Sequence, residues 1–359
     1  MRITDRYVLR EFVAYLGLAL IGLLALFVIV DVFEKIDVFL DHRAPMLMVA
    51  RMYVFQLPEW VVLVLPIALL MSTFLSLGQL NKFGELTAMR SLGLSLVRIL
   101  TPVFTVAAIG TVGSFLFNEI VTPRATRVRD RIFDVEIQRH PPTAANERAD
   151  MTFLGEGGRI YYARLYVVSE RRMHEVSLQE FKGGQLTRRI DAAEASWDGG
   201  RWVFSSGYVR TFENGAEQAH SFTRLAVDGL SERPEDFARE KRDPKEMDYV
   251  ELGRYIGKLR ASGARIANYL VDLHMKLSFP LINFIVVMIG AAVATRLRLQ
   301  SAALGFGLSI AIAFVYYAFM RAGQAFGHSG LLPPYLAAWL GDVVFGSVGT
   351  VMMWRAQRH

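Results

Sequence analysis

The sequence predicts an α-helical membrane protein of six transmembrane helices, with an all-β domain inserted between the third and the fourth. Three observations predict this fold: six long apolar runs, a polar segment of about 150 residues at the midpoint, and a strand-like pattern within that segment. A run of about 18 uncharged apolar residues is long enough to cross the hydrocarbon layer as a helix. The runs are 12–30, 60–78, 99–118, 277–295, 302–320 and 333–354, and the one charge within them is Asp342.

The composition excludes several classes of enzyme. The chain has 359 residues, 53% of them hydrophobic, and no cysteine, so it has no disulfide, thiol nucleophile or thiolate metal site. It contains no GxxxxGK[ST] loop and no HExxH, and its seven histidines show no metal-binding spacing. The sequence therefore predicts no catalytic residues, no metal site and no bound cofactor for this chain.

The distribution of charge predicts the orientation. Residues 122–272 hold 25 Lys and Arg against 24 Asp and Glu, so this nearly neutral domain gives nucleic-acid binding little electrostatic support. If the N-terminus is cytoplasmic, the short outer loops carry Lys35, Arg43 and Arg51, with no Lys or Arg between Gly323 and Leu332, whereas ten basic residues lie inside. These are Arg2, Arg6, Arg10, Lys82, Arg90, Arg98, Arg296, Arg298, Arg355 and Arg358. The positive-inside rule then predicts that both termini are cytoplasmic and the insert is outside. The first run has no small-residue cleavage site after it, so we expect a retained span.

The insert has the pattern of a β domain. Segments near 151–155, 159–168, 174–182, 185–197, 201–212 and 219–228 are rich in aromatic and β-branched residues, and turns at 157–158, 183–184, 199–200 and 214–215 contain glycine. Strands at this spacing favour a sandwich, a jelly roll or an open barrel. Strand 160–168 is apolar on both faces, so one face is core and the other is covered or binds an apolar group. The alternatives are a strand buried on both faces, or one that is simply rich in Tyr.

Two helical stalks are expected to flank these strands. They are predicted at 123–139 and at 248–272, the second with Asp248 as its N-cap. The expected domains are thus 1–122, 123–272 and 273–359, with spans 1–3 in the first and spans 4–6 in the last.

The loop between the second and third spans, at about 81–93, predicts a short helix. Leu86, Met89 and Leu92 recur every three residues and form one apolar face, and Gly93 suits the end of a helix. Such a helix can lie against the membrane or dock into a groove on a partner. Glu85 is an acid in an otherwise basic cytoplasmic loop, which favours a basic socket on a partner.

Two further groups of polar residues lie at or in the membrane. Lys35, Arg43, Lys276 and Arg321 are candidate contacts for the phosphates of a lipid, together with Arg51 and His274. The alternatives are snorkelling, or pairing with the nearby acids Asp31, Glu34, Asp37 and Asp41. Asp342 is a functional candidate because charged residues within spans are rare. It can instead be protonated, or hydrogen-bonded to polar groups of the spans such as Asn283, Ser309 or Gln324.

Several local motifs resemble one known family. Leu57-Pro58-Glu59-Trp60 with Leu65-Pro66, and Leu77-Gly78 through Glu85, Met89 and Gly93, resemble the second span and the coupling helix of the LptF/LptG permeases of the lipopolysaccharide exporter. Three more motifs resemble the LptG branch of that family. They are Asp5-Arg6-Tyr7, Leu252-Gly253-Arg254-Tyr255-Ile256 running on to Lys276 and Pro280, and Leu332-Pro333-Pro334 with Ala337-Ala338-Trp339-Leu340. The resemblance covers essentially the whole chain.

The resemblance implies a transport subunit in the bacterial inner membrane. It implies a heterodimer with an LptF-like permease, two copies of a cytoplasmic LptB-like ATPase that bind ATP and Mg, and an LptC-like partner. Lipopolysaccharide would pass from the outer leaflet of the inner membrane to a periplasmic β-jelly roll.

The resemblance also assigns roles to particular residues. Glu85 matches the coupling glutamate of the family, so we expect Glu85, Leu86, Met89 and Arg90 to couple the chain to the ATPase. Lys35 and Arg321 would lie near the glycolipid phosphates, although Asp31, Glu34 and Asp37 stand where the family has basic residues. The alternatives from other classes are a membrane-anchored periplasmic scaffold protein and a proton-coupled carrier that uses Asp342.

Overall fold

The computed structural model describes two compact units. It covers residues 3–138, 147–155, 157–182, 185–213, 216–238, 247–261, 266–296 and 302–358. The helical unit is Met1–Phe133 together with Ala267–His359, and the second unit is Asp134–Ile266. The predicted domain boundaries at 122/123 and 272/273 stay a prediction, whereas these compact units divide at 133/134 and 266/267.

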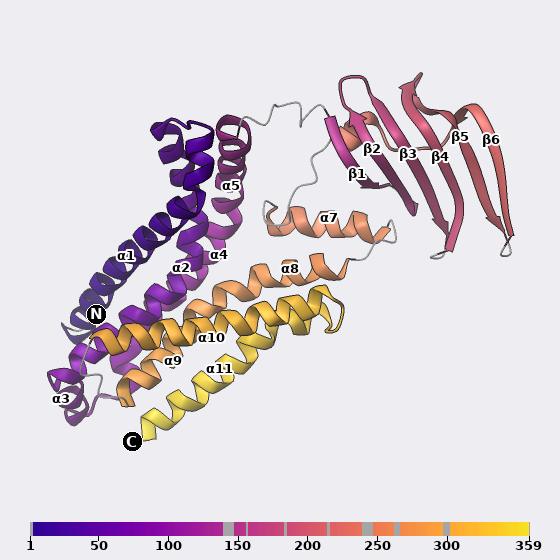
Figure 1. Ribbon diagram of the computed structural model, residues 1–359. Coiled ribbons are helices and arrows are strands. Elements are labelled where there is room, and N and C mark those ends of the chain that lie inside the picture. Colours follow the sequence, from indigo (N-terminus) through magenta and orange to yellow (C-terminus); the bar gives the residue numbers. More distant parts are fainter. Residues whose placement is uncertain are drawn as a thin grey trace. The chain divides into compact units, whose positions relative to one another are not determined.

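The helical unit contains the six expected spans. Six helical segments of the described chain are long and apolar enough to cross a membrane, and the fourth of them combines α8, a 3-10 turn and α9. The helices are α1 (Ile3–Asp41), α2 (Met46–Lys82), α3 (Glu85–Ser91), α4 (Leu96–Ile120), α5 (Thr122–Arg131), α8 (Ala267–Ser278), α9 (Ile282–Arg296), α10 (Ala302–His328) and α11 (Pro334–Arg358). Pro280 lies in the 3-10 turn Phe279–Leu281 that separates α8 from α9. Helix α1 begins, and α11 ends, at the end of the unit that carries α3 (Figure 1).

The core of this unit is built around α2 and α9, the most buried spans. Leu70 and Phe74 of α2 are fully buried with Val286 and Val287 of α9. Gly290 permits this close approach, since a Cβ atom there would lie 2.6 Å from Leu70 Cδ1. In contrast, α1, α10 and α11 leave most of their apolar surface uncovered, as helices do that face lipid or another chain.

The second unit contains one antiparallel sheet of six strands in sequence order (Figure 1). The strands are β1 (Glu147–Leu154), β2 (Arg159–Val167), β3 (Arg172–Lys182), β4 (Gln185–Asp198), β5 (Arg201–Glu213) and β6 (Ala216–Val227). The inserted all-β domain is thereby confirmed, and closure into a jelly roll stays an inference. The turns at 157–158 and 199–200 hold glycines with positive φ, whereas 183–184 and 214–215 lie outside the described residues.

A strap after β6 fills one face of the sheet. In helix α6 (Pro234–Ala238), the ring of Phe237 lies 4.4 to 6.0 Å from the rings of Phe153, Tyr161, Tyr166 and Trp202. These rings come from β1, β2 and β5. A flat sheet would hold β2 and β5 about 14 Å apart, at about 4.8 Å per strand. The sheet therefore curls around the strap.

Glu232 of the strap is held by hydrogen bonds to the sheet. Tyr161 donates to Glu232 Oε2 at 2.9 Å, and Trp202 Nε1 donates to the Glu232 carbonyl at 2.8 Å. Burial, together with the charge of Glu232, raises the pKa of Tyr161 far above its usual range, so its hydroxyl remains a donor. On the opposite face of β2, Tyr162 and Arg164 are exposed. Burial on both faces, one alternative for this strand, is therefore wrong.

The flanks of the sheet are helical, as predicted. After α5 the chain continues as a π-helix at Ile132–Ile137. On the other side, α7 (Tyr249–Ala261) begins after Asp248, whose side chain accepts a hydrogen bond from the Glu251 amide at 2.7 Å. Asp248 is therefore the N-cap that the sequence predicts.

Candidate functional site

Helix α3 is bounded by two glycines in the left-handed region. Gly84, at φ 72°, ends α2 and starts α3, and Gly93, at φ 84°, follows the last turn of α3. The Gly93 amide donates to the Arg90 carbonyl at 2.9 Å, and the Leu94 amide donates to the Met89 carbonyl at 3.3 Å. This pair of bonds is a Schellman motif, which fixes the direction in which the chain leaves the helix. The loop predicted at about 81–93 thus contains a short helix, Glu85–Ser91, with both ends defined, while Asn81 and Lys82 belong to α2.

The inward side of α3 is part of the core of the helical unit. Leu86 and Met89 are 3% and 9% exposed and pack in the same cluster as Leu96 and Ile99 of α4. Leu92 does not continue this face, because it lies beyond the helix end and is 82% exposed. The prediction of one apolar face is correct for Leu86 and Met89 and wrong for Leu92.

Glu85 has a partner within its own chain. Its Oε1 atom accepts a hydrogen bond from the Tyr7 hydroxyl of α1 at 3.3 Å, and its side chain is half-buried. Arg90 is exposed on the same short helix. The solvent-facing side of α3 and its flanks therefore carries Arg90 with the exposed apolar residues Phe83 and Leu92.

A second contact joins the start of α1 to the start of α4. Arg98 Nη2 lies 2.9 Å from Asp5 Oδ2, and Asp5 is only 9% exposed. Beside this pair is a pocket of about 490 Å³ with mainly apolar walls. It is lined by Ile3, Thr4, Asp5, Val8, Met89, Leu94, Arg98 and Ile99. The pocket lies where α1, α3 and α4 meet.

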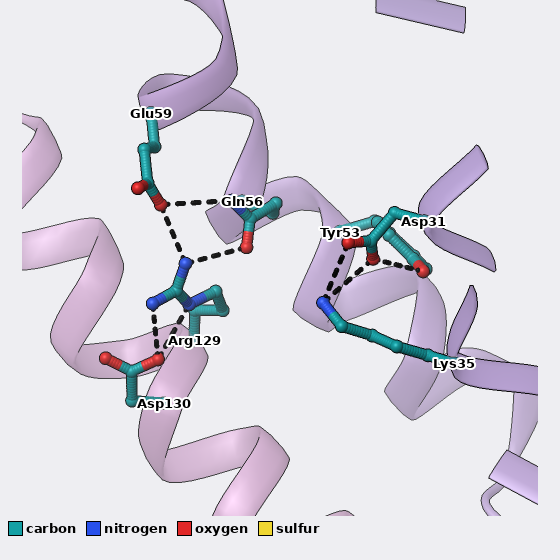
Figure 2. Close-up of polar contacts among 7 residues, drawn as sticks. All are labelled: Asp31, Lys35, Tyr53, Gln56, Glu59, Arg129 and Asp130. Atoms are coloured by element: carbon teal, nitrogen blue, oxygen red, sulfur yellow. Dashed lines mark hydrogen bonds and ion pairs between the residues drawn. The ribbon is translucent and has the colours of Figure 1, made fainter. Parts of the chain in front are cut away.

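At the opposite end of α1, Lys35 is paired with an acid. Lys35 Nζ lies 2.9 Å from both carboxylate oxygens of Asp31, and Tyr53 of α2 donates to Asp31 Oδ2 at 2.9 Å (Figure 2). The ammonium also lies 5.5 Å from the centre of the Phe133 ring. Pairing with Asp31, one of the alternatives for this lysine, is therefore confirmed. An anion that binds Lys35 has to compete with Asp31.

A second ionic cluster lies beside it and joins α2 to α5. Arg129 Nη1 lies 2.7 Å from Glu59 Oε2 and donates to Gln56 Oε1 at 2.8 Å, and Arg129 Nη2 lies 2.6 Å from Asp130 (Figure 2). The sequence analysis did not single out Arg129. Since Arg129 lies 70 residues from Glu59, no local spacing indicates this contact.

The other predicted phosphate contacts differ in their surroundings. Lys276 is 9% exposed, and its ammonium lies 3.2 Å from Glu119 of α4. Arg43 is exposed in the turn between α1 and α2, with φ 49°. Arg321 is exposed on α10 and donates to Gln324 at 3.1 Å. Of the four cations, Arg43 and Arg321 are thus the most accessible to a ligand.

Asp342 on α11 is bonded to a residue that the sequence analysis did not name. The Tyr316 hydroxyl of α10 donates to Asp342 Oδ1, and Oδ2 is buried with no hydrogen-bond partner among the described residues. The suggested partners bond elsewhere: Asn283 to Pro280, Ser309 to Gly305 and Gln324 to Asp272. A hydrogen bond to the spans is therefore correct, but the expected donors are wrong.

One family of known proteins matches nearly the whole chain, and the match includes nearly all of the contacts described above. The family described as lipopolysaccharide export system permease LptF/LptG matches residues 6–355. The chain belongs to the LptF/LptG family. A search of curated proteins found no match.

Membership of the LptF/LptG family makes the chain a lipopolysaccharide export permease, a transport subunit rather than an enzyme. It also agrees with the six candidate spans and supports a place in the inner membrane. The match does not separate the F-type from the G-type permease. In this LptF/LptG permease, α3 lies in the loop at about 81–93, for which a coupling role stays a prediction.

The contacts that sequence reasoning missed in this LptF/LptG permease share one property. Tyr7 meets Glu85 across 78 residues, Arg98 meets Asp5 across 93, and Tyr316 meets Asp342 across 26. Each pair joins two helices. Helical periodicity gives the face of each helix but not the partner that it meets.

Proposed function

We propose that the chain is the LptG-type subunit of an ATP-driven lipopolysaccharide exporter. In this role it pairs with an LptF-like permease, contacts one of two LptB-like ATPases through α3, and delivers lipopolysaccharide towards an LptC-like partner. The ATP and Mg are bound by the ATPase, not by this chain. The motif Asp5-Arg6-Tyr7 and the other G-type motifs support this choice.

The observation that carries the coupling role is the two-sided character of α3. Its inward residues Leu86 and Met89 are packed in the core, so a displacement of α3 moves the spans. Its outer side offers Arg90 with the exposed Phe83 and Leu92. Exposed apolar residues beside a charge are typical of a helix that docks into a partner.

Replacement of Glu85 by Ala tests this role. We expect the variant to reach the membrane but to lose bound ATPase, or to keep the ATPase while hydrolysis no longer drives lipopolysaccharide release. The measurement is copurification with the ATPase, followed by ATP hydrolysis and release in proteoliposomes. Thr87→Ala is the control, since Thr87 is exposed on the same helix and its side chain carries no charge. A Glu85→Ala complex with normally bound, fully coupled ATPase would contradict the proposal.

The substrate side of the proposal concerns α1 and α10. These helices leave apolar side chains such as Leu18, Ile21, Phe314 and Val315 uncovered, as half of a cavity shared with a second permease would require. Arg43 and Arg321 are exposed polar residues on the same two spans or beside them. Photocrosslinkers at Ile21 and Phe314 should give lipopolysaccharide adducts, whereas one at the buried Val287 should not.

The inserted domain is proposed to lie in the periplasm and to receive the acyl chains. Exposure to water costs about 0.8 kcal/mol per methylene group, so a lipid with several acyl chains needs an apolar surface throughout its transfer. The inner face of the curled sheet is apolar, but Leu178, Ile190 and Phe204 are fully buried there, so acyl chains could reach this face only if the packing around the strap opens. The excess of basic residues in the loops on the α3 side supports a cytoplasmic position for α3 and an outer position for the sheet.

A further inference from the structure

The first two turns of α1 lie at a junction with α3 and α4, and this junction is not closely packed. The pocket of about 490 Å³ separates parts of the three helices, with Val8 on α1 and Met89 on α3 among its walls. Where side chains do not interlock, polar contacts carry more of the connection between helices. Two such contacts are present here: Tyr7 with Glu85, and Asp5 with Arg98.

The two contacts have different characters. Tyr7 is exposed and its 3.3 Å bond to Glu85 is long, so this bond alone holds α1 weakly against α3. Asp5 is almost completely buried and its 2.9 Å bond to Arg98 is charge-assisted. Loss of Arg98 would remove this charge-assisted bond to a carboxylate whose side chain is only 11% exposed, which is unfavourable. The ion pair is therefore the polar contact that holds the first turn of α1 in position against α4.

This placement matters because α1 has little other support. It is the least covered of the six spans, and most of its apolar surface faces outwards. Among the described residues near α3, Val8 and Phe12 are the ones of α1 that are buried in the main core. If α1 shifted at Asp5, Tyr7 would move away from Glu85, and α1 would follow a displacement of α3 less closely.

We propose that Asp5 and Arg98 are positioning residues, whose ion pair holds the start of α1 where Tyr7 meets Glu85, so that movement of the coupling helix is passed to the first span. This inference rests on the proposed function. It assigns the pair a part in coupling, and none in binding or hydrolysis of ATP.

A first test compares variants that remove one charge of the pair with variants that keep both charges. Asp5→Asn and Arg98→Gln should keep the ATPase bound and active, while lipopolysaccharide release per ATP hydrolysed falls about tenfold, as for a coupling interaction of ordinary strength. Arg98→Lys and the exchange of Asp5→Arg with Arg98→Asp should retain release, because each keeps an ion pair. Arg6→Gln is the matched control, since Arg6 is exposed on the same turn. Asp5→Asn that releases lipopolysaccharide as well as Arg6→Gln overturns the proposal.

A reversible cross-link keeps the test decisive if the first variants fold poorly. The chain has no cysteine, so Asp5→Cys with Arg98→Cys introduces the only two thiols. In the assembled exporter, the reduced form should hydrolyse ATP without release, and a short thiol cross-linker added to the same sample should restore release. Full release by the reduced form, or no recovery once it is cross-linked, overturns the proposal.

A spectroscopic readout separates positioning from general stability. A spin label at Phe33→Cys, which is exposed on α1, should change its mobility when ATP and vanadate are added. Asp5→Asn should abolish that change while Arg6→Gln keeps it, and a change that persists in Asp5→Asn overturns the proposal. The failure of the proposed function gives a different result, in which no ATPase copurifies with the unmodified chain.

Discussion

At the scale of single residues, pairing decides which cations are available to an anionic ligand. Lys35 and Arg129 both lie at the end of the helical unit away from α3, and each contacts carboxylates of its own chain (Figure 2). Lys276 is likewise paired with Glu119. The Lys35–Asp31 pair is only partly buried, so a phosphate that offers more charge can compete with the carboxylate. Contact between Lys35 and a glycolipid phosphate therefore stays a prediction, with Asp31 as its competitor.

Removal of that competitor is the direct test. Asp31→Asn should strengthen binding of lipopolysaccharide by about fivefold, because it frees Lys35 from its partly buried ion pair. Lys35→Ala should weaken binding. Affinity for purified lipopolysaccharide in detergent measures both effects. Asp41→Asn is the matched control, since Asp41 is an exposed acid at the end of the same helix. Equal affinities for Asp31→Asn and Asp41→Asn would remove Lys35 from the site.

The hydrogen bond between Tyr316 and Asp342 has a structural consequence that can be measured. Tyr316→Phe leaves Asp342 without its only described donor and should lower the free energy of unfolding by about 1–3 kcal/mol. Thermal unfolding in detergent measures the loss, and Tyr335→Phe, at an exposed tyrosine, should change nothing. Asp342→Asn should leave transport unchanged. A transport defect in a stable Asp342→Asn protein would favour the proton-coupled carrier.

At the scale of elements, α3 depends on backbone conformation as much as on its side chains. Gly84 and Gly93 both have positive φ, and a Cβ atom at either would meet nothing within 4 Å. The glycines are therefore required for the left-handed conformation and not for space. The element is defined by its two ends, and its inward face then fixes how it lies on the core.

Substitution of these glycines should displace α3 without disturbing the spans. Gly84→Ala and Gly93→Ala should each cost about 1–2 kcal/mol of backbone strain and reduce the amount of ATPase that copurifies. The helical content of the purified chain should stay the same. Gly253→Ala is the control, because Gly253 lies within α7, has open space around its Cα and has no positive φ. Normal copurification in both α3 variants would show that the ends of α3 do not position its docking face.

At the scale of the whole molecule, the features that depend on local pattern could be predicted from sequence. The six spans follow from uninterrupted apolar runs, and the six strands follow from aromatic and β-branched segments between glycine turns. The strap with Phe237 was missed, because its pattern resembles an ordinary polar connection and its role depends on how far the sheet curls. The Tyr7–Glu85 and Arg129–Glu59 contacts were missed because they depend on which helices become neighbours.

The orientation in the membrane can be tested with single cysteines, since the chain has none of its own. Ser91→Cys on α3 should react with a membrane-impermeant maleimide only after the inner membrane is opened. Ser221→Cys on β6, which is exposed, should react in spheroplasts with an intact inner membrane. The reverse labelling pattern would contradict the predicted cytoplasmic position of both termini.

The continuity of α1 has a geometric consequence. Helix α1 runs for 39 residues without a proline, which corresponds to about 58 Å at 1.5 Å per residue, nearly twice the thickness of the hydrocarbon layer. A stiff rod of this length that tilts about a point within the bilayer moves its two ends in opposite directions. An inward pull at Tyr7 would therefore swing Lys35 outwards, so that one movement at the α3 end of α1 is felt at its other end.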